Sequence, residues 1–206
     1  MRLHVVFSDD TLVVVDKPAG MLSVPGRGAD KQDCAAACVQ ALHADARVVH
    51  RLDMATSGLL LMARGDAAQR RLSIAFAERE VAKRYVAVVH GRLPSAGGEI
   101  DLPLVADWPH RPRQKVDAAS GKPSLTRYRV LSEDASSDTS RVELEPVTGR
   151  SHQLRVHMLA IGHPIVGDTL YGAPEAARLM LHACELRFVH PATGLRMRLQ
   201  SAAPFT

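Results

Sequence analysis

The sequence predicts an α+β fold, with a mixed, mainly antiparallel sheet flanked by helices. Short runs that alternate between apolar and polar residues are interleaved with helix-length amphipathic segments. Several of the strand-like runs are joined by brief polar turns, which is typical of hairpins and so of antiparallel pairing. The chain has 206 residues, 46% of them hydrophobic, and shows no repeat, low-complexity tract or linker. We therefore expect residues 1–206 to form a single domain with one core.

The first half of the chain supplies two strand pairs and two helices. Two strands are expected in 3–17, with a turn at Ser8–Asp10, and a Gly- and Pro-containing loop should follow in 21–30. The segment 48–64 reads as strand, polar loop, strand. The first helix is expected in 31–45, with an apolar face of Ala35, Cys38, Val39 and Leu42. The second helix is expected in 66–80, with an apolar face of Ala68, Leu72, Ala75 and Phe76.

The second half begins with a strand in 83–93 and then a long irregular segment, 103–122, which carries three prolines and the only tryptophan. Long structureless loops in compact domains tend to be functional or disordered. A hairpin is expected from 124 to 147 with a polar tip at 134–139. A helix should follow in 151–164, capped by Ser151 and ended by Gly162. The tail should form a last hairpin that turns at Pro191–Gly194.

Bulk composition limits the classes of function. The net charge of +4 favours a polyanionic partner such as nucleic acid. Aromatic residues are only 4% of the chain, which argues against a broad stacking platform for single strands. No apolar run is long enough for a membrane span, and the polar Ser8–Asp10 comes too early for a signal peptide. We expect a cytoplasmic monomer whose three cysteines form no disulfide framework.

Cofactor motifs are absent from the sequence. Ten histidines are present, but neither they nor Cys34 and Cys38 show zinc-ligand spacing. The Gly26–Gly28 segment lacks the Gly-Lys-Ser/Thr end of a phosphate loop, and no Gly-x-Ser-x-Gly nucleophile elbow occurs. We expect no metal and no nucleotide cofactor.

The segment "VVHRLDMATSGLLLMAR" (48–64) places a single carboxylate in a short polar gap between two strands. Residues i and i+2 of an extended chain point the same way, so Arg51 and Asp53 are expected to share a face. A neighbouring guanidinium keeps a carboxylate ionised, which suits a nucleophile or a base. The residues alone leave an alternative open, in which Asp53 forms a turn or a local ion pair.

Four segments in order resemble motifs of the RluA family of pseudouridine synthases. They are "VVVDKPAGMLSVPG" (13–26), "HRLDMATSGLLLMAR" (50–64), "KRYVAVVHG" (83–91) and "TGRSHQLRVHMLAIGHPIVGDTLYG" (148–172). The second resembles the family's catalytic motif, His-Arg-Leu-Asp-x-x-Thr-Ser-Gly. The resemblance covers nearly the whole chain and implies a pseudouridine-synthase-like domain.

The resemblance also implies a reaction and its residues. Family members isomerise uridine to pseudouridine without a cofactor: the N-glycosidic bond breaks, the uracil turns, and a bond forms at C5. The reacting base must leave the helix stack. By the match, Asp53 is the catalytic carboxylate, Arg155 pairs with it, Tyr85 packs on the flipped uracil, and Arg51 fills the gap that the base leaves. The first step at Asp53 stays open between attack on C1′, attack on the base, and proton abstraction at C2′.

Substrate expectations follow from a narrower resemblance. Segments 101–117 and 145–159 resemble a dual-specificity subgroup that modifies large-subunit ribosomal RNA and a tRNA anticodon stem-loop. Many family members carry an N-terminal S4-type RNA-binding domain; here the first motif begins almost at once, so none is expected. Structured RNA is then the expected partner, with the basic segment 103–122 as a clamp. The candidate RNA-binding residues are His50, Arg51, Arg111, Arg113, Lys115, Arg150 and His152.

Two other functions stay open from the sequence. The chain could be a non-catalytic RNA-binding or ribosome-assembly module with the same fold, although it contains Asp53, Tyr85 and Arg155. It could also be a metal-dependent hydrolase that uses its histidines and aspartates.

Overall fold

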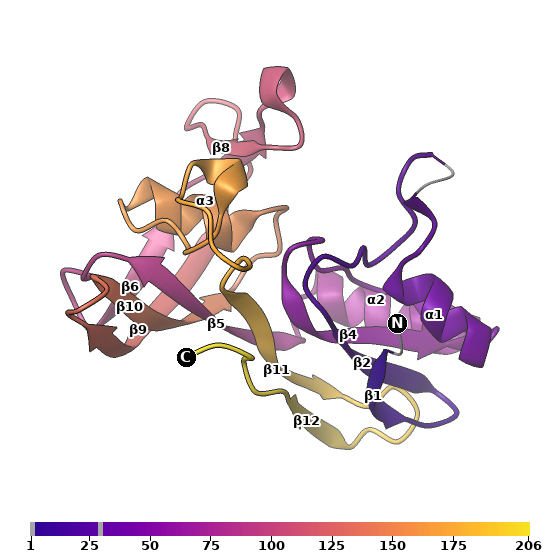
Figure 1. Cartoon of the computed structure of the whole chain (residues 1–206). Helices are drawn as coiled ribbons and strands as arrows, with labels where there is room; N and C mark the ends of the chain where they lie inside the picture. The colour runs from indigo at the N-terminus through magenta and orange to yellow at the C-terminus, as the bar shows by residue number, and fades with distance from the viewer. Residues whose placement is uncertain (1–2, 29–30) are drawn as a thin grey trace. The chain divides into compact units, whose positions relative to one another are not determined.

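The computed structural model describes residues 3–28 and 31–206, so the end of the expected loop at 29–30 lies outside the described residues. The chain divides into two compact units (Figure 1). Unit 1 comprises the chain up to Lys83 together with Ala183–Ala203, and unit 2 comprises Arg84–His182 with Pro204–Thr206. The assignment of the whole chain to one domain stays a prediction.

Unit 1 is built on an antiparallel sheet. Strands β1 (His4–Ser8) and β2 (Leu12–Lys17) form the first hairpin, and β2 also pairs with β4 (Ser57–Arg64). Strand β3 (Ala46–Val48) pairs with the other end of β4, and the last hairpin joins β11 (Leu181–Val189) to β12 (Arg196–Gln200). The strand, loop and strand expected in 48–64, and the turns at 8–10 and 191–194, are confirmed.

The core of unit 1 lies between this sheet and helix α2 (Gly65–Ala77). Ala68 and Leu72 of α2 pack with Leu12 and Val14 of β2, and Phe76 packs against the same cluster, as the helical stripe predicted. Val13 and Val15 are also fully buried, so β2 is covered on both faces, which explains its unbroken apolar run.

Unit 2 contains four strands that pair antiparallel in the order β5-β10-β9-β6. Its strands are β5 (Ala82–His90), β6 (Gly97–Asp101), β9 (Leu125–Asp134) and β10 (Thr139–Pro146). Helix α3 (Gln153–Ala160) contacts β9 and β10. The α+β class and the hairpin at 124–147 are confirmed.

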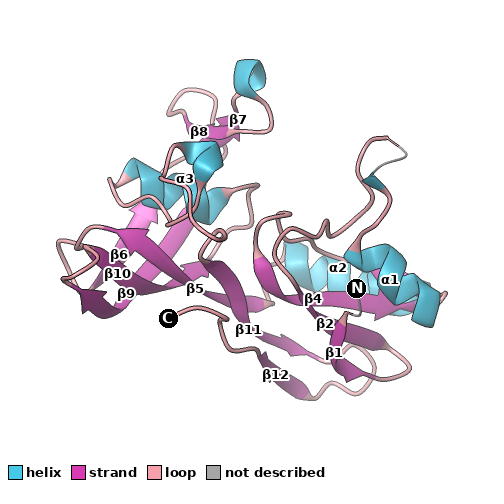
Figure 2. Ribbon diagram, viewed as in Figure 1, coloured by secondary structure: helices cyan, strands magenta, loops and turns pink. Residues whose placement is uncertain are grey.

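The expectation that 103–122 lacks secondary structure is wrong. This segment forms a small hairpin of β7 (Leu104–Ala106) and β8 (Gln114–Val116), with the 3₁₀ turn η2 (Trp108–His110) between them (Figure 2). We call residues 104–116 the basic hairpin. These strands have only three residues each, with prolines before and between them, and are too short to show a period of two in the sequence. Strand β6 was missed as well.

Two details of the helices differ from expectation. In α1 (Ala35–Leu42) the buried residues are Ala35, Ala36 and Val39, whereas Leu42 at the frayed end is 66% exposed. Ser151 does not cap α3: the residue before the helix is His152, in the left-handed conformation with φ +54°. Gly162 does end it, with φ +88° and its N–H donating to Leu159 O at 2.9 Å. Among the residues described, no helix is long and apolar enough to cross a membrane.

Candidate active site

Lys17 holds the main chain of the Asp53 loop. Its side chain is fully buried, and its ammonium group donates to the carbonyls of Pro18 at 3.0 Å, Met21 at 2.8 Å and Met54 at 3.2 Å. Gly20 N–H also donates to Met54 O at 2.8 Å. The two segments that resemble family motifs are thus joined within unit 1, because the end of β2 holds the residue next to Asp53.

Ser23 holds the residue on the other side of Asp53. Its hydroxyl donates to Leu52 O at 2.7 Å and accepts from Leu52 N–H at 3.0 Å, and both residues are buried. Thr56 N–H donates to Asp53 O at 3.1 Å, which closes a tight turn after the carboxylate. Asp53 is half-buried and Arg51 is exposed. The loop is therefore ordered by bonds to its backbone.

His50 lies inward at the start of the loop. Its ring stacks on Phe76 with the centroids 4.5 Å apart, and its Nε2 accepts from Leu61 N–H at 2.9 Å. Burial, with a smaller contribution from nearby Lys83, lowers the pKa of His50 to about 3. Burial also lowers the pKa of Lys83. A neutral His50 that accepts from β4 positions the loop, and its contact with RNA stays a prediction.

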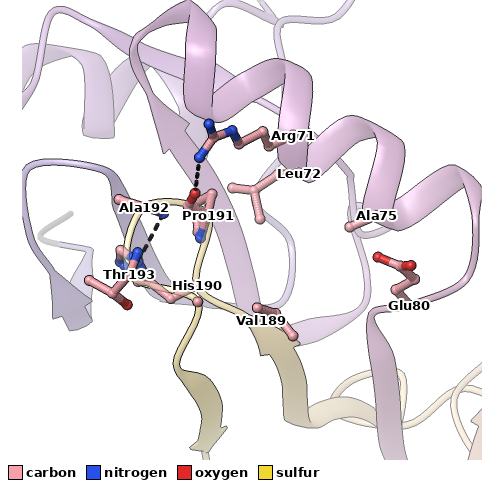
Figure 3. Close-up of a pocket in the computed structure, with 10 residues that line it drawn as sticks. Arg71, Leu72, Ala75, Glu80, Val189, His190, Pro191, Ala192 and Thr193 are labelled. Carbon is pink, nitrogen blue, oxygen red and sulfur yellow. Dashed lines mark hydrogen bonds between the residues drawn. The ribbon is translucent and has the colours of Figure 1, made fainter.

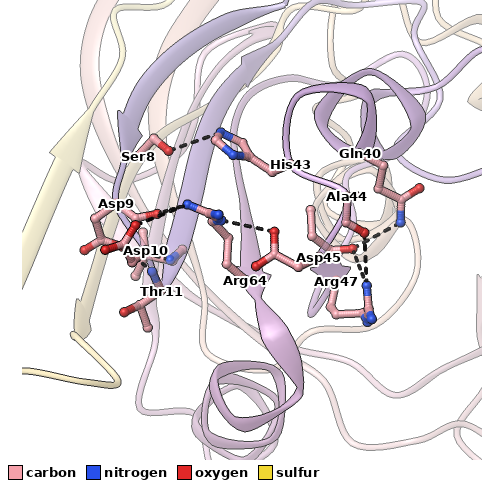
Figure 4. A network of polar contacts seen from close by, with 12 residues as sticks. Ser8, Asp9, Asp10, Thr11, Gln40, His43, Ala44, Asp45, Arg47 and Arg64 are labelled. Carbon is pink, nitrogen blue, oxygen red and sulfur yellow. Dashed lines mark hydrogen bonds and ion pairs between the residues drawn. The ribbon is translucent and has the colours of Figure 1, made fainter.

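The remainder of the motif fixes strand β4. Gly58 has φ +113°, and a Cβ there would lie 2.3 Å from Ala183 O, so only glycine fits. At the other end of β4, Arg64 donates to Asp9 O at 2.8 Å and to Asp45 Oδ1 at 3.2 Å (Figure 4). The motif thus specifies a strand anchored at both ends as well as a reactive loop.

In unit 2 the guanidinium of Arg155 forms a two-bond ion pair with Asp168. Arg155 Nε donates to Asp168 Oδ2 at 2.8 Å, and Nη2 donates to Oδ1 at 2.6 Å. The side chains are 6% and 1% exposed. The family resemblance named Arg155 but not Asp168, which follows 13 residues later in the segment "GDTLYG". The pairing of Arg155 with Asp53 joins residues of different units and stays a prediction.

Tyr171 lies at the centre of the same cluster. Its ring is 5.0 Å from the Arg155 guanidinium and 5.5 Å from that of Arg113. Its hydroxyl accepts from Gln114 N–H at 2.9 Å and lies 2.8 Å from His152 Nδ1. Three residues proposed from the sequence, Arg113, His152 and Arg155, therefore meet around one buried tyrosine.

The basic hairpin presents an exposed stacked pair. Trp108 is 66% exposed, and the guanidinium of Arg111 lies 3.4 Å from the centre of its ring. Lys115 is exposed on β8 and lies 3.8 Å from Asp117. Arg150, before α3, is exposed and donates to Pro123 O at 3.3 Å, which places it near the end of the segment that contains the hairpin.

Tyr85 lies in β5, half-buried, opposite Leu144 of β10. Asp53 belongs to unit 1, whereas Tyr85 and Arg155 belong to unit 2. Sequence reasoning missed Lys17, Ser23, Asp168 and Tyr171. All four lie inside the segments that resemble family motifs. Their place in these segments was the one sign in the sequence that they do more than form turns.

A pocket of about 470 Å³ lies elsewhere in unit 1. Figure 3 shows it between α2 and the turn that joins β11 to β12, where Arg71 donates to Pro191 O. His190 in its wall is 3% exposed and pairs with Asp9 at 2.7 Å. None of the catalytic or RNA-binding residues proposed from the sequence is among the residues that line this pocket. Within 3–28 and 31–206, no group of three or more His, Cys, Asp or Glu is arranged to hold a metal ion.

Comparisons with known proteins agree with these motifs. Residues 11–160 match the family model described as RNA pseudouridylate synthase. The chain is 51% identical over 207 aligned residues to the dual-specificity RNA pseudouridine synthase RluA of Escherichia coli K12, covering 98% of this chain and 94% of that protein. It is 46% identical, with the same coverage, to the RluA of Haemophilus influenzae. Among solved structures, human RNA pseudouridylate synthase domain containing 1 superposes with a TM-score of 0.82 at 31% identity, covering 99% of this chain and 84% of that one.

Proposed function

The chain belongs to the RNA pseudouridylate synthase family, and from that premise we propose that it isomerises specific uridines in structured RNA, with Asp53 as the catalytic carboxylate. The observation that carries the proposal is the Asp53 loop, whose backbone is held on both sides of the carboxylate by Lys17 and Ser23. A pre-ordered carboxylate loses little freedom when a nucleotide binds beside it. Substrate and product contain the same atoms, so the reaction needs no outside reductant or group donor.

The remaining roles follow the family resemblance. Tyr85 packs on the flipped uracil, Arg155 supplies a positive charge beside Asp53, and exposed Arg51 occupies the space that the base leaves in the stack. By the resemblance of segments 101–117 and 145–159, the substrates are large-subunit ribosomal RNA and a tRNA anticodon stem-loop. The similar RluA proteins are named dual-specificity RNA pseudouridine synthases, which agrees with two kinds of substrate. The protein acts in the cytoplasm as a monomer, within one catalytic domain and without a metal or nucleotide cofactor.

Replacing Asp53 with Asn tests the assignment. We expect pseudouridine formation to fall below detection while RNA binding is largely kept, because the amide has the carboxylate's shape without its charge. Pseudouridine mapping of ribosomal RNA and tRNA from a deletion strain, complemented with each variant, is the measurement. The control is Asp66→Asn, which neutralises an exposed carboxylate of the same unit that pairs with Arg47. An unchanged product yield in Asp53→Asn would contradict the assignment of Asp53 as the catalytic carboxylate.

The same experiment separates the other two functions. A non-catalytic RNA-binding module would bind the RNA but leave no pseudouridine even with the wild-type chain. A metal-dependent hydrolase would lose its activity in excess chelator, whereas we expect pseudouridine formation to continue.

The basic hairpin is the proposed RNA clamp. His110, Arg111 and Lys115 are exposed on it, and the stacked Trp108–Arg111 pair offers both a flat surface and a positive charge. Phosphate contacts of this kind set the register of an RNA, while splayed loop bases supply selectivity. Each phosphate contact releases condensed counterions, so affinity should fall steeply with salt.

Replacing Arg111 and Arg113 with Ala tests the clamp. We expect weaker RNA binding and a salt slope (log Kd against log salt) shallower by about 1 for each lost phosphate contact. Titration of a labelled anticodon stem-loop at several salt concentrations measures it. Arg196→Ala, which removes an exposed arginine of β12, is the control for loss of a positive charge from another part of the surface. A slope equal to that of the wild type would show that the hairpin is not the clamp.

A further inference from the structure

The turn Asp168–Gly172 contacts both a residue proposed for the chemistry and the segment proposed to bind RNA. We propose that this turn is a positioning element: Asp168 fixes the orientation of Arg155, and Tyr171 couples that orientation to the basic hairpin. The inference rests on the proposed function, because it assigns the turn a role through Arg155 and the hairpin.

The geometry of the Arg155–Asp168 pair fixes one guanidinium orientation. Two parallel bonds, Nε to Oδ2 at 2.8 Å and Nη2 to Oδ1 at 2.6 Å, define both the plane and the direction of the group. Both side chains are buried. Removing two charges from water costs free energy, and apolar residues of similar volume often give equal or greater stability. A positioning role therefore explains the pair better than stability does.

The carboxylate is itself held by a rigid turn. Tyr171 N–H and Ala173 N–H both donate to Asp168 O, at 3.0 and 3.1 Å, and Asp168 N–H donates to Ile165 O at 3.1 Å. Gly172 follows the 3₁₀ turn η3 (Thr169–Tyr171) with φ +82°. Because the backbone of Asp168 is bonded on both sides, its side chain presents a fixed pair of oxygens to Arg155.

Tyr171 brings the hairpin into contact with this assembly. Its hydroxyl accepts from the backbone N–H of Gln114 in β8, and its ring lies under the Arg155 guanidinium. One rigid side chain therefore contacts the hairpin at its hydroxyl and the arginine at its ring. The guanidinium of Arg113 lies over the same ring, so the hairpin also contacts the tyrosine through this side chain.

These contacts predict that RNA bound on the hairpin influences Arg155. A shift of β8 moves Gln114 N–H, and the tyrosine that accepts from it must turn or lose the bond. A turn of the Tyr171 ring changes the surface beneath the Arg155 guanidinium. The ion pair with Asp168 opposes any change in the orientation of that guanidinium. Spatial contact alone does not establish such coupling, so a double-mutant cycle is the appropriate test.

The first experiment separates positioning from charge balance at Asp168. Asp168→Asn leaves Arg155 without its paired charge, and we expect a lower thermal midpoint and a lower single-turnover rate at saturating RNA. Asp168→Glu restores the charge with a longer arm, so the midpoint should recover while the rate stays roughly 100-fold below wild type, as misplacement of a catalytic group by about 1 Å causes. RNA affinity should be unchanged in Asp168→Glu.

The matched control is Glu185→Gln, which neutralises another buried carboxylate that pairs with two arginines, Arg187 and Arg198. It should lower the midpoint and leave the single-turnover rate intact. If Asp168→Glu recovers the rate together with the midpoint, Asp168 serves only charge balance and its positioning role is overturned.

The second experiment tests the coupling through Tyr171. In the wild-type background, Arg111→Ala should lower both RNA affinity and the saturating single-turnover rate. In the Tyr171→Phe background, which removes one oxygen and keeps the ring, Arg111→Ala should lower affinity only. Equal effects of Arg111→Ala on the rate in both backgrounds would overturn the coupling.

The proposed function fails separately from this inference. If the wild-type chain forms no pseudouridine, both are overturned. If the wild type and Asp168→Glu react equally fast while Asp53→Asn is inactive, only the inference is overturned.

Discussion

The Asp53 loop of unit 1 and the Arg155 cluster of unit 2 are ordered by different means. Lys17 and Ser23 bond to the main chain of Met54 and Leu52, so these bonds position the carboxylate through its backbone. Arg155 is held through its own side chain, by two bonds to Asp168 and by the ring of Tyr171. The bonds to the main chain fix the loop on both sides of Asp53, whereas the bonds at Arg155 fix one side chain.

The difference between the two regions matters for mutagenesis. Damage to the support of Asp53 should appear as local disorder of a loop, while damage to the support of Arg155 leaves a buried charge without its paired carboxylate. The three predictions below test this contrast, beginning with the largest expected effect.

Replacing Lys17 with Met should have the largest effect. The variant removes the donor of the Pro18 and Met21 carbonyls, while Met54 O keeps the N–H of Gly20, and an unpaired buried group costs about 1–3 kcal/mol. We expect a loss of unfolding free energy of at least about 2 kcal/mol and a roughly 100-fold lower single-turnover rate from displacement of the loop. Urea unfolding and pseudouridine formation measure them, with exposed Lys31→Met as control. A rate near that of the wild type would mean that Lys17 does not support the reactive geometry.

Replacing Ser23 with Ala should have an intermediate effect. One hydroxyl serves both the N–H and the C=O of buried Leu52, so its loss should cost about 1–3 kcal/mol of unfolding free energy. The rate should fall less than in Lys17→Met, and RNA affinity should be retained. Exposed Ser73→Ala on α2 provides the control. If Ser23→Ala and Ser73→Ala prove equally stable and active, Ser23 does not contribute to the support of the Asp53 loop.

Acid pH should have the smallest effect, and it compares the units directly. Burial lowers the pKa of His50 in unit 1 to about 3 and also lowers that of His157 in unit 2. As pH falls below about 6.5 the unfolded chain takes up protons that the folded chain does not, so stability present above pH 6.5 is lost. For His50 this loss continues down to about pH 3.

Urea unfolding at pH 7.0 and 5.5 should show a loss of roughly 1 kcal/mol from His50, and His157 should change the stability in the same direction. His50→Gln and His157→Gln should each reduce the pH dependence of the unfolding free energy. If neither variant changes it, other groups control the acid response.

The sequence predicted the regular parts of the fold because their signals are local. Apolar and polar residues alternate in 124–147, which is the period of a strand. Ala68, Leu72 and Phe76 recur at the period of a helix. The basic hairpin was missed because its strands are only three residues long and because Pro103, Pro109 and Pro112 lie before and between them. Ser151 looked like a cap because serine caps helices well, but the left-handed His152 moves the start of α3 by one residue.

The site could be predicted only as far as its motifs reach. Asp53 read locally as a turn residue, and the family-like segments made it a catalytic candidate. The partners of the key groups lie far along the chain: Lys17 reaches Met54, and Asp168 reaches Arg155. No local period records such contacts, because they depend on which turns bring distant segments together. A lysine at the end of a strand also reads as exposed, whereas Lys17 is fully buried.

The division of the chain has a consequence for synthesis on the ribosome. Unit 1 is discontinuous, since its last strands come from Ala183–Ala203 and all of Arg84–His182 is made before them. Until then Leu12, Leu59 and Leu61 can pack with α2 but lack Leu186 and Phe188 of the same cluster. Part of the apolar surface of the first strands therefore stays uncovered until the last strands are made, and only then is the unit that holds Asp53 complete.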